Sequence, residues 1–181
     1  AFCSAIGNET KAGTSKYVAS VLPRISGKYE ENLDSESLLH TVSVTTRHID
    51  GSMNSQERNG ILQWLAEESD NERECRVVTN VRCLSEGVDV PSLDAVLFLS
   101  ARNSQVDVVQ SVGRVMRTFH KGQSDEKKYG YIIIPIVVPS DISAEEALDN
   151  NKTFDVVWAI LNALRSHDDR FNAMVNKIAL N

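Results

Sequence analysis

The sequence has 181 residues, of which 41% are hydrophobic and 24% charged, and its formal net charge is −6. These values describe one ordinary globular domain with an appendage and enough apolar material for a hydrophobic core. The negative balance argues against a protein that coats polyanions through its overall field, so a contact with nucleic acid must come from a local cluster of Lys and Arg.

The cysteines and histidines form no recognisable site. The three cysteines stand far apart without a CxxC pair, and the four histidines lack the spacing of metal ligands. No stretch is long and apolar enough to span a bilayer, and no signal peptide opens the chain. We therefore expect a cytoplasmic protein with reduced thiols, no metal site and no membrane contact. The first residues read as a strand entered midway, without an initiator Met, which predicts a fragment of a longer polypeptide.

Short apolar runs alternate with helical patterns over most of the chain, an arrangement typical of an α/β fold with a parallel sheet. We expect strands at residues 1–6, 41–49, 76–79, 95–99 and 131–138.

The helices between these strands are marked by their ends. A helix over 14–22 should stop at Pro23, and residues 26–37 read as an exposed loop. Capping residues at 54–57 predict the start of a second helix. Its buried stripe should consist of Ile61, Leu62 and Leu65, with Trp64 beside them. Past Pro139 the pattern becomes helical, so we expect a domain over 1–139 and a helical appendage or connector over 140–181.

Residues 104–118 predict an amphipathic helix with one apolar and one polar face. The apolar side should carry Val108, Val109, Val112, Val115 and Met116. The polar face holds residues at i, i+3, i+4 and i+7, which are Gln110, Gly113, Arg114 and Arg117.

A glycine inside a helix costs about 1 kcal/mol relative to alanine, so Gly113 suggests that something must approach this face closely. Arginine donates bidentate hydrogen bonds to phosphate, and Arg114 and Arg117 stand about one turn apart. A solvent-facing helix that is merely basic explains the spacing equally well.

A second polar segment, residues 77–91, leaves a predicted strand at its carboxyl end, where parallel sheets usually bind ligands. Gly87 permits backbone conformations closed to other residues. Asp89 could accept a hydrogen bond from a ribose hydroxyl, and Thr79 could donate one to a phosphate. Each of these residues is also a common loop cap, so both interpretations stay open.

Taken together and in this order, the segments resemble the motifs of superfamily 2 helicases. Thr79-Asn80 together with residues 86–91, Glu86-Gly87-Val88-Asp89-Val90-Pro91, resembles motif V of this family. The stretch from Gln110 to Arg117 resembles motif VI. Motif IV is similar to Phe2-Cys3-Ser4, and the strand and turn after it are similar to His48-Ile49-Asp50-Gly51. The resemblance covers residues 1–139. It implies the second RecA-like domain, a three-layer α/β domain with a central, mostly parallel sheet.

The resemblance also implies roles for individual residues. In this family ATP lies between two RecA-like domains, and the first domain holds most of the nucleotide and its Mg²⁺. Gln110, Arg114 and Arg117 would be the catalytic residues, with the arginines acting on the γ-phosphate. The residues near the nucleotide would be Glu86, Gly87, Asp89 and Gly113. Contacts with the nucleic-acid backbone would come from Ser4, Thr79, Asn80 and Arg82.

The parts of the first RecA-like domain are absent from this sequence. No GxxxxGK[ST] phosphate loop occurs, and no acidic pair follows an apolar strand in a way that could hold Mg²⁺. We therefore expect this chain to be inactive alone as an ATP hydrolase and to act with a first RecA-like domain of the same polypeptide.

Residues 100–104 resemble restriction-type helicase subunits more than DEAD-box RNA helicases. Residues 157–168 resemble a segment of the large predicted helicases of single-chain restriction–modification systems, although a generic pair of docking helices explains them equally well. This finer resemblance implies an ATP-dependent translocase that acts on DNA rather than RNA. A noncatalytic RecA-like docking module is the alternative, motivated by the missing phosphate loop and the net charge of −6. A dinucleotide-binding Rossmann domain is disfavoured, because no GxGxxG follows the first strand.

Overall fold

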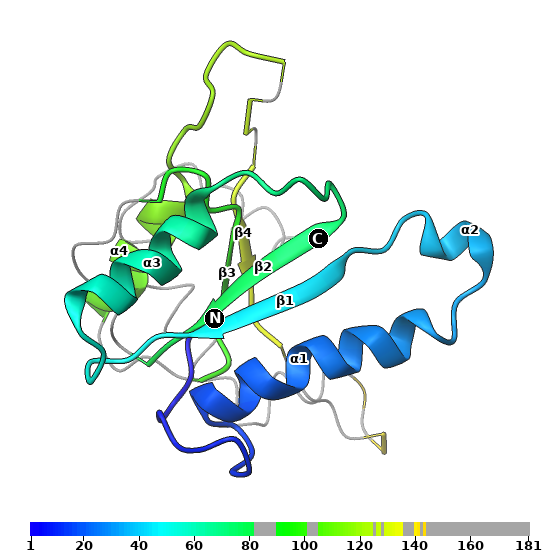
Figure 1. The fold of residues 1–181 in the computed structure, drawn as a ribbon, viewed down its shortest axis with the longest axis horizontal. Coiled ribbons are helices and arrows are strands. Elements are labelled where there is room, and N and C mark those ends of the chain that lie inside the picture. The colour runs from blue at the N-terminus through cyan, green and yellow to red at the C-terminus, as the bar shows by residue number, and fades with distance from the viewer. Residues whose placement is uncertain are drawn as a thin grey trace.

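A parallel sheet forms the centre of the computed structural model, which describes residues 1–81, 90–100, 105–124, 126–127, 129–135, 140–141 and 143. Strand β1 (Ser43–His48) pairs in parallel with β2 (Glu74–Thr79), and β3 (Ala95–Leu97) pairs in parallel with β4 (Tyr131–Ile133). The predicted α/β fold with parallel strands is therefore confirmed (Figure 1).

The first residues of the chain join the two pairs of strands. Phe2 forms parallel bridges to Asn80 on one side and to Phe98 on the other. Its amide donates to Leu97 O at 2.8 Å, and the Cys3 amide donates to Asn80 O at 2.8 Å. This short segment thus occupies the middle of the sheet, between β2 and β3.

The first strand is shorter than predicted, because the backbone turns away after Cys3 to meet the first helix. The carbonyl of Ala5 accepts from the amide of Ser15 at 2.8 Å, and that of Ile6 accepts from Lys16 at 3.2 Å. These bonds satisfy amides at the start of a helix that have no partner inside it. The residues expected to extend the strand therefore serve as a cap.

Helix α1 (Ser15–Glu30) packs on β1 and β2 and runs through Pro23 instead of stopping there. Proline has no amide proton, so the carbonyl of Ala19 loses its usual partner one turn before it. The hydroxyl of Thr46, on β1, donates to that carbonyl instead. The predicted end at Pro23 and the start of the predicted loop were thus wrong. A tertiary hydrogen bond replaces the one that proline removes.

Two further helices begin at side-chain caps. Helix α2 (Ser35–Leu38) starts where Asp34 Oδ1 accepts from the Ser37 amide at 2.7 Å. Helix α3 (Ser55–Ala66) starts at the predicted capping box, in which Asn54 and Glu57 accept from each other's amides at 2.9 Å.

The apolar stripe of α3 is only partly buried, which differs from the prediction. Trp64 lies under two guanidinium groups, with Arg47 at 4.3 Å and Arg76 at 5.4 Å from its ring centroid. Arg76 also donates to the carbonyls of Trp64 at 2.6 Å and Glu67 at 2.9 Å. These bonds satisfy acceptors at the end of the helix and join it to β2.

Helix α4 (Gln105–Val115) contributes the largest part of the described core. Its buried valines pack against the middle of the sheet, where the rings of Phe2 and Phe98 stack 5.5 Å apart. The core cluster consists of Phe2, Val96, Phe98, Val108, Val112 and Val115. Met116, predicted on the apolar face, is 60% exposed because the helix has ended before it.

The C-terminal part of the prediction lies almost entirely outside the described residues. This applies to the end of the strand expected over 131–138 and to the helices expected within 140–181. Among the residues that the structure describes, no helix is long and apolar enough to cross a membrane.

Candidate functional site

Three of the four residues predicted to form the polar face of α4 lie on the helix. Gln110 and Gly113 are exposed, and Arg114 is half-buried in the last turn of the helix. Arg117 lies beyond the helix end, where its amide donates to Arg114 O at 3.3 Å in a tighter turn. The expected helix over 104–118 was too long, so Arg117 is not held by regular helical geometry, although it is exposed.

The fold itself gives no reason for glycine at position 113. A Cβ atom there would meet no described atom of this chain within 4 Å, and the backbone does not have a positive φ. Gly130 is the opposite case, because a Cβ atom there would lie 2.6 Å from both the O and Cγ1 atoms of Val115. Gly113 thus leaves a clear approach to the polar face, whereas Gly130 lets the chain pack against the end of α4.

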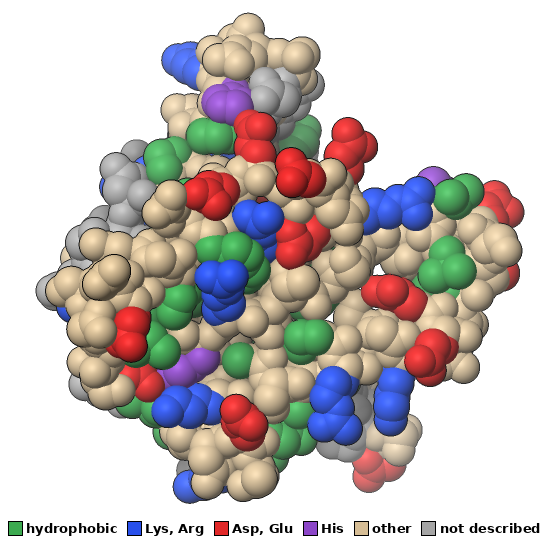
Figure 2. Space-filling model, in the orientation of Figure 1, with side chains coloured by type: hydrophobic (Ala, Val, Ile, Leu, Met, Phe, Trp, Pro, Cys, Tyr) green, Lys and Arg blue, Asp and Glu red, His purple; other side chains and the backbone are tan. Residues whose placement is uncertain are grey.

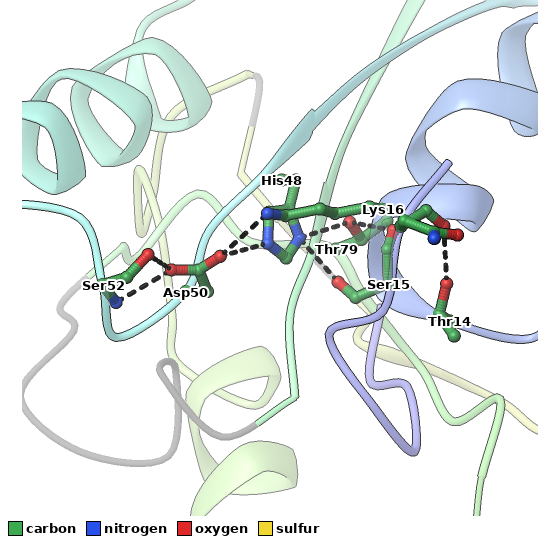
Figure 3. A network of polar contacts seen from close by, with 8 residues as sticks. Thr14, Ser15, Lys16, His48, Asp50, Ser52 and Thr79 are labelled. Atoms are coloured by element: carbon green, nitrogen blue, oxygen red, sulfur yellow. Dashed lines mark hydrogen bonds and ion pairs between the residues drawn. The ribbon is translucent and has the colours of Figure 1, made fainter. Parts of the chain in front are cut away.

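A second polar cluster joins the start of α1 to the carboxyl end of β1 (Figure 3). His48 Nδ1 lies 2.8 Å from Ser15 Oγ, and His48 Nε2 lies 2.9 Å from Asp50 Oδ2. Asp50 also accepts from the Ser52 amide at 2.8 Å and lies 3.6 Å from Lys16 Nζ.

The hydrogen bonds of this cluster keep Asp50 ionised. Those from Ser52, followed by the one from His48, hold the pKa of Asp50 well below its ordinary value. An ionised Asp50 can only accept hydrogen bonds, so Nε2 of His48 carries a proton and donates a hydrogen bond to Asp50 Oδ2. In the neutral ring, Nδ1 then accepts from the hydroxyl of Ser15.

A serine, a histidine and an aspartate in this order resemble the triad of a hydrolase, but access to the serine excludes that chemistry. Ser15 has an exposed fraction of 0%, so its hydroxyl cannot meet a substrate.

A cavity of about 390 Å³ opens beside the cluster, lined by Glu9, Lys16, Ala19, Ser20 and His48. The buried part of the cluster holds α1 and the strand ends together. Its signal in the sequence is a pair of polar residues, His48 and Asp50, on either side of the buried Ile49.

The predicted nucleic-acid contacts divide into exposed and buried residues. Ser4, at the carboxyl end of the central segment, is exposed. Thr79 and Asn80 have exposed fractions of 0%. The Thr79 hydroxyl donates to Ser15 O at 2.9 Å, and the Asn80 side-chain amide donates to Ala1 O at 3.2 Å. Thr79 and Asn80 therefore hold the strand ends in this structure and do not reach solvent.

Four further predicted site residues lie outside the described residues, namely Arg82, Glu86, Gly87 and Asp89. In the described part of the chain, no group of three or more His, Cys, Asp or Glu side chains could hold a metal ion. On the face that Figure 2 shows, basic and acidic side chains are interspersed and form no single basic patch.

Residues 22–119, more than half of the chain, match the helicase conserved C-terminal domain. The chain therefore belongs to this family, the C-terminal domain of superfamily 2 helicases, as the resemblance of its motifs predicted.

Two relatives narrow this placement. The chain is 32% identical over 95 residues to a probable helicase of African swine fever virus, a region that covers 52% of this chain and 10% of the viral protein. Its structure is similar to that of the ATP-dependent Type ISP restriction-modification enzyme LlaBIII bound to DNA. In that comparison the identity is 44% and the TM-score 0.75, over 92% of this chain and 10% of the enzyme. The predicted restriction-type resemblance is thus confirmed, and the chain spans about a tenth of the length of these relatives.

Proposed function

We propose that this chain is the second motor domain of an ATP-dependent DNA translocase or helicase of the restriction type. The similarity to LlaBIII, whose structure is bound to DNA, supports DNA over RNA. The observation that carries the proposal is the exposed polar face of α4, where Gly113 leaves open space beside Gln110 and Arg114. Nothing in the described fold requires a glycine there, and a nucleotide held by another domain accounts for it.

In this proposal the substrate, ATP, is bound mainly by a first RecA-like domain that this chain does not contain. That first domain would also hold Mg²⁺, which would neutralise charge on the phosphates. Arg117, which is exposed, and Arg114, which is half-buried, stabilise the charge that develops on the γ-phosphate. Gln110, one turn earlier, links the phosphate to the interface between the domains. Gly113 keeps the approach free of side-chain atoms.

The segment with Glu86, Gly87 and Asp89 completes the nucleotide side of the proposed site, next to the sugar and the attacking water. The first described residue after this segment is Val90, which is buried. We also propose that residues 1–139 form the motor domain and that residues 140–181 form a helical appendage or a connector to the rest of the polypeptide.

The proposed nucleic-acid contacts are made to the sugar–phosphate backbone, which suits a motor that moves along any sequence. Ser4 is exposed and can make such a contact directly. Thr79 and Asn80 contribute by fixing the strand ends next to it, and Arg82 follows them in the chain. The interspersed charges on the face in Figure 2 and the net charge of −6 favour a few local contacts over a broad basic surface.

The test is Arg117→Ala in the full-length polypeptide that carries this chain. Loss of an arginine finger lowers turnover by about 10³–10⁵-fold, and we expect a loss of this order in DNA-stimulated ATP hydrolysis. The affinity for ATP should change much less, because the first domain provides most of the binding. The matched control is Arg24→Ala, which removes an exposed arginine from α1 and should leave turnover unchanged.

Near-normal turnover of the Arg117→Ala protein would refute the arginine-finger role. A full-length polypeptide without a phosphate loop would instead favour the noncatalytic docking module. The isolated chain should show no ATP hydrolysis and at most weak, salt-sensitive DNA binding, so robust hydrolysis by it would contradict the proposal.

A further inference from the structure

Lys127 contacts residues that follow each of the two segments of the proposed nucleotide site. Its side chain Nζ donates to Pro91 O at 2.9 Å and to Leu93 O at 3.0 Å. Its backbone amide donates to Phe119 O at 3.1 Å. Pro91 stands two residues after Asp89, and Phe119 stands two residues after Arg117. One residue thus joins the segment leaving motif V to the segment leaving motif VI.

The charge and the length of the Lys127 side chain suit it to these two hydrogen bonds. A charged ammonium donates stronger hydrogen bonds than a neutral group, and its long stem lets it reach two carbonyls in another segment. Burial lowers the pKa of Lys127, against the opposite effect of the nearby carboxylate of Asp94. Because Lys127 is half-buried and donates to two carbonyls, its side chain is not simply a solvated surface lysine.

The same stretch of chain is anchored to α4 at a second point. Gly130 packs so closely against Val115, the last residue of the helix, that a side chain would contact its backbone oxygen. The chain therefore leaves the helix after Val115 and is back beside it at Gly130, and Arg117 lies in the loop between these two points. The loop extends from the body of the molecule, at the top of Figure 1, and turns at His120 and Gly122, which both have positive φ. Its tip is exposed, whereas its base is held by Lys127 and Gly130.

We propose that Lys127 is a positioning residue, which sets the place of Arg117 relative to the segment that follows Asp89. This inference rests on the proposed function, because positioning matters only if Arg117 acts on the nucleotide. Lys127 itself touches neither ATP nor DNA in this scheme. It acts by keeping the segment at Pro91, 36 residues before it in the chain, in one arrangement with the segment at Phe119.

The test compares Lys127→Met with Lys127→Arg in the full-length polypeptide. Methionine keeps an unbranched stem of similar length but removes both hydrogen bonds. A catalytic group misplaced by about 1 Å can cost on the order of 100-fold in rate, so we expect kcat for DNA-stimulated ATP hydrolysis to fall about 10- to 100-fold. KM for ATP should stay within about twofold, and arginine, which keeps the charge and the donors, should restore most of the rate. Lys121→Met, at the exposed tip of the same loop, is the matched control and should leave kcat unchanged.

A purely structural role would give a different result. It would lower the fraction of folded, active protein while leaving kcat per active molecule unchanged, which active-site titration measures. Lys127→Met should also cause little further loss in an Arg117→Ala background, because both changes remove the same contribution. If the losses of kcat from the two substitutions multiplied in the double variant, the positioning role would be refuted. An unchanged kcat in the Lys127→Met variant would refute it as well. If the methionine variant does not fold, Lys127→Gln keeps one donor group and should show an intermediate loss of kcat.

The outcome is distinguishable from a failure of the proposed function. Normal turnover of Arg117→Ala would refute the arginine finger itself. A slow Arg117→Ala protein beside a normal Lys127→Met protein would refute only the role of Lys127.

Discussion

Two glycines near the end of α4 give opposite predictions for the same substitution. A methyl group at Gly113 meets open space, and alanine is favoured over glycine inside a helix by up to about 1 kcal/mol. Gly113→Ala should therefore raise the free energy of unfolding by up to that amount and the Tm by roughly 2–4 °C for a domain of this size. A methyl group at Gly130 would lie 2.6 Å from the backbone oxygen of Val115, whose exposed fraction is 0%. Gly130→Ala should lower the free energy of unfolding by about 1–3 kcal/mol, the usual cost of overpacking.

Urea denaturation of the isolated chain, followed by circular dichroism, measures both changes. The decisive comparison is then made in the full-length polypeptide, where the more stable Gly113→Ala protein should hydrolyse ATP more slowly, because its methyl group occupies the approach to the arginines. A loss of stability in Gly113→Ala as large as that in Gly130→Ala would refute the reasoning from open space. Full ATP turnover in Gly113→Ala would show that nothing has to approach this face closely.

Three further substitutions test the contacts that hold the sheet and helices together. The lowered pKa of Asp50 means that its ionised form stabilises the fold above about pH 4 and that this contribution is lost as the pH falls. Asp50→Asn should therefore flatten the acid side of the stability profile measured by urea denaturation, and an unchanged profile would contradict the role of that carboxylate. Asn54→Ala should cost about 1 kcal/mol through loss of the capping box, whereas Asn59→Ala, on the exposed surface of the same helix, should be neutral or slightly stabilising. Thr46→Val should cost about 1–3 kcal/mol by leaving a carbonyl without its donor. The cost should shrink in a Pro23→Ala background, where a restored amide takes over, and equal costs in both backgrounds would rule out this compensation.

The features that the sequence predicted well are those encoded by neighbouring residues. The start of α3 follows from Asn54 and Glu57, three positions apart, and both partners of the capping box are visible in the sequence. The parallel strands follow from apolar runs alternating with helical patterns, and the valines of α4 show their burial by helical spacing.

The features that the sequence did not predict depend on partners far along the chain. Helix α1 continues through Pro23 because Thr46, on a strand, supplies the missing donor. The direction of the Thr79 side chain is set by the carbonyl of Ser15, 64 residues earlier. Lys127 carries no recognisable motif, and only the folded chain brings it to Pro91 and Leu93. Spacing thus predicted that Gln110, Gly113 and Arg114 share one face of α4, whereas the long-range contacts near this helix could not be predicted.

The central place of Phe2 in the sheet has a consequence for the order of folding. Its two bridging partners, Asn80 and Phe98, are made long after it during synthesis. Contacts between residues so distant in the chain are slow to form, because a large loop must close before they contribute. Phe2 therefore gains its second neighbour in the sheet only after Phe98 has been synthesised. Until then its ring lacks one of the two neighbours that bury it, so this segment presents an apolar side chain to solvent during synthesis, a state that favours aggregation.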